Sequence, residues 1–149
     1  MAGDKMEIRL TKVNKSDKYE VMRDEKSTGR SVFFFAYHAT YKQTKGGDLF
    51  DGVNNVGYGT VSLFQGNGPV SGYDVNEKEG DTYRQEWSGE CFSLSGPEGK
   101  PVAYCTGGHF VVPGSGTGRF AGISGGGYWR AHARPDGDFE VEDNSVYEK

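Results

Sequence analysis

Proline, cysteine and long apolar runs are all scarce in this sequence. Its 149 residues include 5 prolines and 2 cysteines. No apolar run approaches the length of a membrane span, which excludes a transmembrane helix. The first residues, 1–9, lack the apolar segment of a secretory signal. We therefore expect a cytoplasmic protein, with Cys91 and Cys105 as free thiols, although an exported chain would change that expectation.

Motifs for metal ions, phosphate and nucleic acid are also missing. Three histidines and two cysteines are scattered without a ligand spacing such as Cys-x-x-Cys. No Gly-Lys-Ser or Gly-Lys-Thr follows the glycines of 114–118, so these are not a phosphate-binding loop. The net charge is -4, and charges of both signs are interspersed, which argues against a basic face for nucleic acid. We expect no cofactor, no metal ion and no nucleic-acid or membrane partner.

Glycine and aromatic residues are abundant instead. The 24 glycines lack the period of collagen and are too many for a helical bundle, so they indicate turns, bulges and close backbone approaches. Nine Tyr, nine Phe and two Trp are typical of strands and ligand pockets. A chain of this length is expected to form a single domain, 1–149, around one core.

Alternating apolar and polar residues predict six to eight strands. A weak first strand covers 6–13, and residues 15–30 are predicted to be a loop with a short edge strand. The clearest strand is 31–42. Further strands are expected at 56–65, 70–75, 82–94, 102–112, 128–133 and 139–146. Tight turns join them, which predicts an all-β antiparallel sandwich or barrel, and the many glycines favour the barrel.

The segment 107–129 connects two of these strands through a glycine-rich turn. Within it, Phe120 and Ile123 lie three residues apart, the spacing of one helical turn, and Ser115 or Thr117 could cap that turn. An apolar turn between two strands would plug one end of a small barrel.

Part of this segment, Val111-Val-Pro-Gly-Ser-Gly-Thr-Gly-Arg-Phe-Ala-Gly-Ile-Ser-Gly-Gly-Gly, resembles the signature of the allene oxide cyclase barrel superfamily. That group includes plant dirigent proteins, allene oxide cyclases and bacterial domains of similar length. The resemblance implies an eight-stranded antiparallel barrel with an interior cavity for an apolar small molecule, and its better-known members form trimers. The matching residues describe barrel architecture, so no catalytic residue is carried over.

Seven aromatic residues could line such a cavity and bind its substrate: Phe33, Phe35, Tyr37, Tyr83, Trp87, Tyr128 and Trp129. They could equally fill the interior, because a small eight-stranded barrel can be packed solid. Gln85 and several tyrosine hydroxyls share their faces, so both interpretations stay open.

The hairpin 82–112 allows two registers. In one, Glu86 lies opposite His109, and the pair could act as an oriented general base. In the other, shifted by one residue, Cys91 lies opposite Cys105 and Trp87 opposite His109. The alternating charged residues of this hairpin favour a simpler hypothesis, in which Glu86 faces water and the thiols are inert.

The other histidines have two interpretations each. His38 has apolar neighbours, so it is either a hydrogen-bonded core residue or a catalytic group with a displaced pKa. His132 alternates with alanines beside two arginines and is expected to face outward. If it faced inward, Tyr128, Arg130 and His132 would form a strip for an anionic substrate.

These residues lead to one main functional hypothesis and two alternatives. The main one is a cofactor-independent cyclase, isomerase or lyase acting on an apolar or aromatic metabolite, with His38, Glu86 and His109 as candidate catalytic residues. The first alternative is a non-catalytic protein that binds a hydrophobic small molecule, and the second is a packed structural barrel. The run 32–36, apolar on both faces, predicts a homo-oligomer, either a dimer or a trimer.

Overall fold

The computed structural model describes residues 3–149, which form a single antiparallel sheet. Its strands are β1 (Lys5–Glu25), β2 (Arg30–Thr40), β3 (Lys42–Lys45), β4 (Asn54–Phe64), β5 (Gly68–Lys78), β6 (Asp81–Ser95), β7 (Pro101–Val111), β8 (Ser124–Ala133) and β9 (Phe139–Glu148). Two short 3₁₀ turns lie between strands, η1 (Pro97–Gly99) between β6 and β7 and η2 (Gly118–Phe120) between β7 and β8. In residues 3–149 there is no helix long and apolar enough to cross a bilayer.

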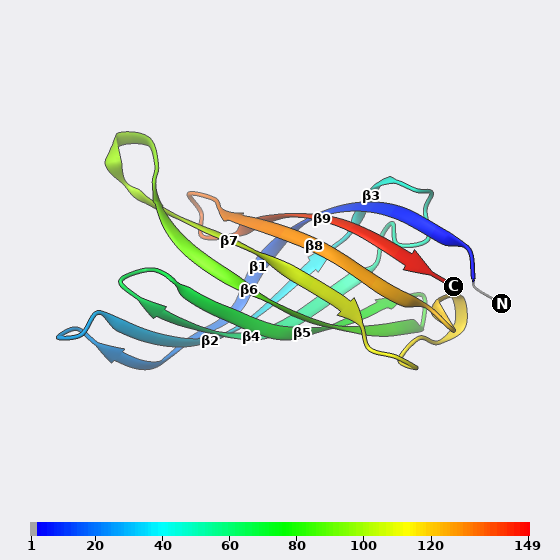
Figure 1. Ribbon diagram of the computed structural model, residues 1–149, viewed down its shortest axis with the longest axis horizontal. Helices are drawn as coiled ribbons and strands as arrows, with labels where there is room; N and C mark the ends of the chain where they lie inside the picture. Colours follow the sequence, from blue (N-terminus) through cyan, green and yellow to red (C-terminus); the bar gives the residue numbers. More distant parts are fainter. Residues whose placement is uncertain (1–2) are drawn as a thin grey trace.

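The sheet closes on itself. Neighbouring strands follow the order β2-β4-β5-β6-β7-β8-β9-β1, and β1 also pairs with β2, so eight strands form a ring. The short β3 continues the path of β2 and pairs with the N-terminal half of β1. The ring is not an even barrel, because the β6–β7 hairpin bends away from the β1–β2 hairpin at one end (Figure 1). The predicted closed, all-antiparallel sheet is confirmed.

The N-terminal region differs from its prediction. A single 21-residue strand, β1, covers the expected strand 6–13 and most of the expected loop 15–30, up to Glu25; a turn at 26–29 then leads into β2. Its first half pairs with β9 and its second half with β2, with irregularities between Ser16 and Lys18 and between Val21 and Arg23. The second half is mostly exposed at the end of the ring, so few of its side chains need to be apolar. Its strand character therefore comes from backbone pairing and leaves little alternation in the sequence.

One end of the ring is packed solid. Its core cluster consists of Ile8, Leu10, Tyr41, Phe50, Val53, Tyr83, Val111, Phe120, Ile123 and Tyr147. Phe50 comes from the loop before β4, and its ring centroid lies 4.7 Å from that of Tyr147 and 5.8 Å from that of Phe120. Phe120 of η2 has no exposed surface. The glycine-rich segment therefore closes this end, as the sequence indicated.

The hydroxyls of Ser115 and Thr117, which could have capped the turn, instead bind backbone groups of β6. Thr117 Oγ1 accepts a hydrogen bond from the Thr82 backbone N–H at 2.9 Å, and Ser115 Oγ accepts one from the Arg84 N–H at 3.1 Å. Thr117 makes no side-chain capping bond to η2. The glycine-rich segment thus runs along the start of β6, and its hydroxyls satisfy backbone groups of that strand.

An ion pair fixes the same segment to the first residue of β6. Arg119 donates from Nε to Asp81 Oδ2 at 2.9 Å, and its backbone N–H donates to the same oxygen at 3.2 Å. Gly118 adopts a φ of +54°, and a Cβ at this position would lie 1.9 Å from Asp81 Oδ1. Glycine is therefore required here both by the backbone conformation and by the carboxylate beside it.

Candidate functional site

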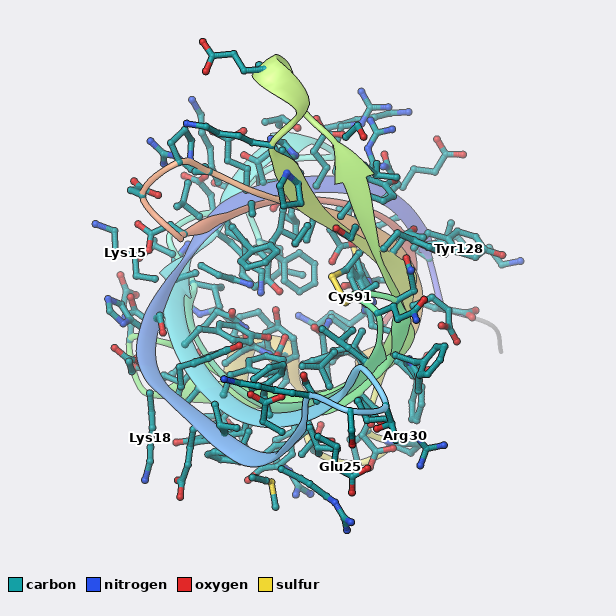
Figure 2. The ribbon with its side chains drawn as sticks, turned by 90° about the vertical axis from the view of Figure 1, so that its left-hand side faces the viewer. Lys15, Lys18, Glu25, Arg30, Cys91 and Tyr128 are labelled. Atoms are coloured by element: carbon teal, nitrogen blue, oxygen red, sulfur yellow. A yellow bond between two sulfur atoms is a disulfide. The ribbon has the colours of Figure 1, made fainter. Side chains whose placement is uncertain are left out.

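The other end of the ring is hollow. A cavity of about 340 Å³ lies inside it, between the packed core and the hairpin tips. Figure 2 looks into the ring from this end. Apolar side chains form most of the wall, among them Phe33, Phe35, Leu63, Trp87, Trp129 and Phe139. The volume falls within the range of small-molecule pockets, and the lining is mostly apolar.

Glycines on the inner face of β4 help to keep the space open. A Cβ on Gly57 would lie 2.0 Å from Tyr37 Cζ, and one on Gly59 would lie 2.6 Å from Phe35 Cζ. The two aromatic rings therefore lie against the β4 backbone instead of projecting across the lumen. This arrangement reconciles the two interpretations of the aromatic residues, since the interior is packed at one end and open at the other.

A layer of buried polar side chains separates the packed core from the cavity. Along their strands these residues are in phase with the core residues. Lys12 lies two positions after Leu10, and Asp143 lies four positions before Tyr147. We call the set Lys12, Tyr37, Asp74, Gln85, His109 and Asp143 the polar layer. All six line the cavity.

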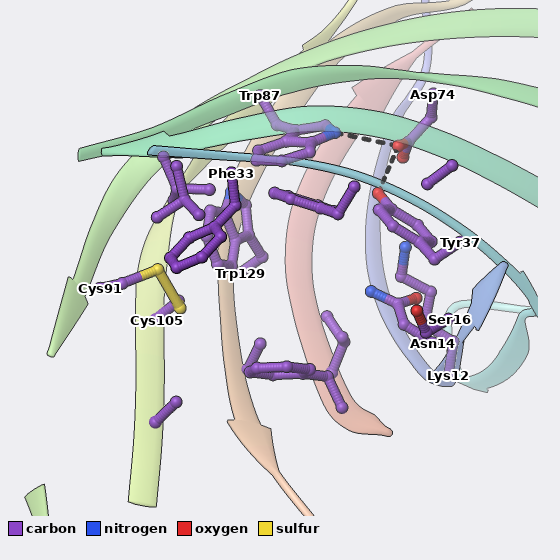
Figure 3. A pocket seen from close by; sticks show the side chains of 18 of the residues that line it. Lys12, Asn14, Ser16, Phe33, Tyr37, Asp74, Trp87, Cys91, Cys105 and Trp129 are labelled. Atoms are coloured by element: carbon purple, nitrogen blue, oxygen red, sulfur yellow. Dashed lines mark hydrogen bonds between the residues drawn. A yellow bond between two sulfur atoms is a disulfide. The ribbon is translucent and has the colours of Figure 1, made fainter. Parts of the chain in front are cut away.

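Asp74 is the first centre of this layer. The Tyr37 hydroxyl donates to Asp74 Oδ1 at 2.7 Å, and Trp87 Nε1 donates to the same oxygen at 3.0 Å (Figure 3). Burial, together with the negative charge of Asp74, raises the pKa of Tyr37 well above its usual value. Tyr37 therefore stays a protonated donor at neutral pH.

His109 is the second centre. Its Nε2 lies 2.8 Å from Asp143 Oδ1 and 2.8 Å from Ser145 Oγ, and Ser145 Oγ in turn donates to Asp143 Oδ1. A carboxylate only accepts hydrogen bonds, so the ring proton resides on Nε2. His109 Nδ1 is buried and has no hydrogen-bond partner within residues 3–149. The imidazole thus has an oriented, unpaired nitrogen, as a general base requires.

Lys12 lies beside both centres. Its Nζ donates to Asn55 Oδ1 at 2.7 Å and lies 4.8 Å from the centroid of the Tyr37 ring. Burial lowers the pKa of Lys12, whereas the negative charges of Asp74 and Asp143 act in the opposite direction.

The two cysteines form a disulfide in the cavity wall, so the expectation of free thiols is wrong. The hairpin adopts the second register, with Cys91 directly opposite Cys105 and their Cα atoms 4.1 Å apart. Figure 3 shows the bond beside Phe33 and Trp129. Disulfides persist in oxidising compartments, which weighs against the cytoplasmic location; that location stays a prediction.

Five of the seven predicted aromatic residues line the cavity: Phe33, Phe35, Tyr37, Trp87 and Trp129. The other two do not. Tyr83 belongs to the packed core at the closed end, and Tyr128 points outward with 78% of its surface exposed. Tyr128 lies on the opposite face of β8 from its neighbour Trp129, because successive strand residues alternate.

Of the three candidate catalytic residues, the structure brings only His109 into the cavity. Glu86 lies opposite Phe110 on the outer face, because the register that would have paired it with His109 is not formed. His38 also faces outward, and its Nδ1 lies 2.6 Å from Asp17 Oδ1. It is out of phase with Phe35 and Tyr37, so it lies neither in the core nor in the wall of the cavity. The expectation that His132 faces outward is confirmed.

Sequence reasoning missed Lys12, Asp74 and Asp143. A usable signal existed for two of them, since Lys12 continues the inward phase of Ile8 and Leu10, and Asp143 shares a phase with Val141 and Tyr147. A charged residue in phase with apolar neighbours on a strand is a candidate for a buried functional group.

Comparison with known protein families and with curated proteins finds no match to this sequence. In the described part of the chain, no group of three or more His, Cys, Asp or Glu side chains comes together to hold a metal ion.

Proposed function

We propose that the protein is a cofactor-independent enzyme that moves a proton on an apolar or aromatic small molecule held in the cavity. The observation that carries the proposal is the buried His109, which lines the cavity, is oriented by Asp143 and Ser145, and has no hydrogen-bond partner for its buried Nδ1 within residues 3–149. A purely binding cavity has no need for an oriented imidazole next to its ligand.

The roles follow from the contacts. The apolar walls would hold the body of the substrate, while His109 Nδ1 would take a proton from it and return that proton at another atom. Asp143 would hold the tautomer and stabilise the imidazolium that forms. Isomerisation, cyclisation and elimination all need only such proton movements.

We also propose a relation to the allene oxide cyclase barrel superfamily. The ring of eight antiparallel strands supports it, as does the position of the glycine-rich segment 111–127 at the closed end. A homo-oligomer through the outer face of β2 remains a prediction, and light scattering at micromolar concentration would test it.

A non-catalytic binding protein is the second candidate. Its support is the apolar outer half of the cavity, where Phe35, Val61, Leu63, Trp87 and Trp129 pack around Val70 and the disulfide. This half could hold a hydrophobic ligand without chemistry.

Proton exchange separates the two functions. The protein is incubated in D₂O with a panel of aromatic and polyunsaturated carbonyl compounds, and NMR follows deuterium incorporation and rearranged products. The enzyme hypothesis predicts catalysed exchange or turnover, and we expect His109→Gln to lower it about 100-fold to 10,000-fold. Asp143→Asn is expected to lower it as well, because it disturbs the tautomer.

The matched control is His132→Gln, the same substitution at an exposed histidine, which we expect to leave the rate unchanged. Binding is followed separately by tryptophan fluorescence, since both tryptophans of the chain line the cavity. Tight binding with no exchange, or equal exchange in His109→Gln, would contradict the enzyme hypothesis and favour the binding protein.

A further inference from the structure

Lys12 is a nucleophilic group at the cavity that the proposed proton transfer does not use. Only 9% of the residue is exposed. Among the described residues that line the cavity it is the single lysine, and no arginine lines it. A buried lysine in an aromatic pocket loses the hydration that normally makes an ammonium group inert.

The amine is held in one position by its neighbours. Its Nζ donates to Asn55 Oδ1 at 2.7 Å, and Asn55 Nδ2 donates to Asn76 Oδ1 at 2.7 Å. The rings of Tyr37 and Tyr41 flank it, with centroids 4.8 Å and 5.1 Å from Nζ. In Figure 3 Lys12 extends from β1 toward Tyr37, on the side of the cavity that carries Asp74.

Attack on a carbonyl needs the neutral amine, because an ammonium group has no lone pair. Burial lowers the pKa of Lys12, and the carboxylates of Asp74 and Asp143 oppose that effect. A neutral Lys12 that donates one N–H to Asn55 keeps its lone pair available for bonding.

We propose that Lys12 forms a reversible imine with an apolar or aromatic aldehyde or ketone held in the cavity. The inference goes beyond proton transfer by His109, although it rests on the same proposed use of the cavity as a small-molecule site. Its ligand class is a carbonyl compound with an apolar body. The carbonyl carbon would reach the polar layer while the body lies against Trp87 and Trp129, which line the cavity.

The step balances without a cofactor. Nζ forms a bond to the carbonyl carbon, and the carbonyl oxygen takes a proton to give a carbinolamine. That oxygen then leaves as water while the nitrogen gives up its remaining proton, which produces the carbon–nitrogen double bond. The carboxylates of Asp74 and Asp143 and the imidazole of His109 are the groups of the polar layer that can exchange these protons.

Reductive trapping tests the proposal. The full chain is incubated with cinnamaldehyde and sodium cyanoborohydride, which converts an imine into a stable secondary amine. Intact mass and peptide mapping then locate the adduct. We expect one adduct, on Lys12, at aldehyde concentrations that leave the exposed lysines unmodified. Lys12→Arg keeps the positive charge and should lose the adduct, while Lys18→Arg, at an exposed lysine, should keep it.

Cinnamyl alcohol has the same carbon skeleton without the carbonyl, so quenching of Trp87 and Trp129 by it reports cavity binding alone. Adducts spread over exposed lysines, or no adduct on Lys12 while the alcohol binds, would overturn the imine and leave the cavity function standing. Absence of both the adduct and the quenching would overturn the imine and also the proposed use of the cavity as a small-molecule site. Because the mapping is done on the unmodified sequence, the test holds even if Lys12→Arg does not fold.

Discussion

At the scale of single residues, four tyrosines are buried in two different parts of the ring. Tyr41, Tyr83 and Tyr147 pack in the closed end, and Tyr37 belongs to the polar layer. Loss of hydration is the first cause that raises the pKa of each phenol, and the buried carboxylates add to it. The folded protein thus requires all four to be neutral.

This requirement predicts alkaline unfolding. An unfolded tyrosine ionises near pH 10, whereas the four buried tyrosines of the folded protein stay protonated at that pH. Their raised pKa values therefore contribute to the stability of the fold below that pH, and the contribution is lost as the pH rises above it. We expect tyrosinate absorbance from these four residues to rise only as near-UV circular dichroism is lost. Complete ionisation of all nine tyrosines while the near-UV circular dichroism stays intact would contradict this prediction.

Tyr83→Phe provides the matched variant. The Tyr83 hydroxyl is buried without a hydrogen-bond partner in residues 3–149, so its removal should not destabilise the protein at neutral pH. The alkaline transition should shift to higher pH, because one fewer buried phenol must ionise. Tyr128→Phe, at an exposed position, should leave the transition where it is.

At the scale of secondary-structure elements, the β6–β7 hairpin holds the open end together. The register places Trp87 opposite His109 and Cys91 opposite Cys105, so a single pairing choice sets both the catalytic candidate and the disulfide. The other register would have turned Glu86 inward. A slip of one residue moves every side chain of a strand to the other face, so sequence alone could not decide between them.

The disulfide is expected to stabilise this hairpin measurably. Its cysteines are 14 residues apart, and closing a loop of that size contributes about 3 kcal/mol. We expect urea unfolding to show a loss of about that size on adding reductant. The double variant Cys91→Ala, Cys105→Ala should be equally destabilised and should not respond to reductant. A wild-type protein that is unaffected by reductant would contradict the bond.

At the scale of the whole molecule, the ring divides along its axis into a packed core, a polar layer and an apolar cavity. The closed end was predictable from Phe120 and Ile123, since both are apolar and one turn apart within a glycine-rich segment. The strand 31–42 was equally clear, because Phe33, Phe35 and Tyr37 share one face, and it forms as β2, which ends at Thr40.

Other features depend on neighbours that sequence does not reveal. Phe50 comes from a loop whose sequence has no apolar periodicity. It is buried because the loop places it in the core cluster of the closed end. The second half of β1 lacks an apolar pattern because it is exposed. The polar layer combines residues from strands that are far apart in sequence, as Lys12, Asp74 and His109 are, so it becomes visible only once the ring closes.

The most direct test of this account is a crystal structure of the protein soaked with a ligand selected by tryptophan quenching. The account predicts density inside the ring in the cavity lined by Trp87 and Trp129, with one polar atom of the ligand within hydrogen-bonding distance of His109 Nδ1. Side chains filling the cavity, or a ligand bound only on the outer face beside Tyr128, would contradict it.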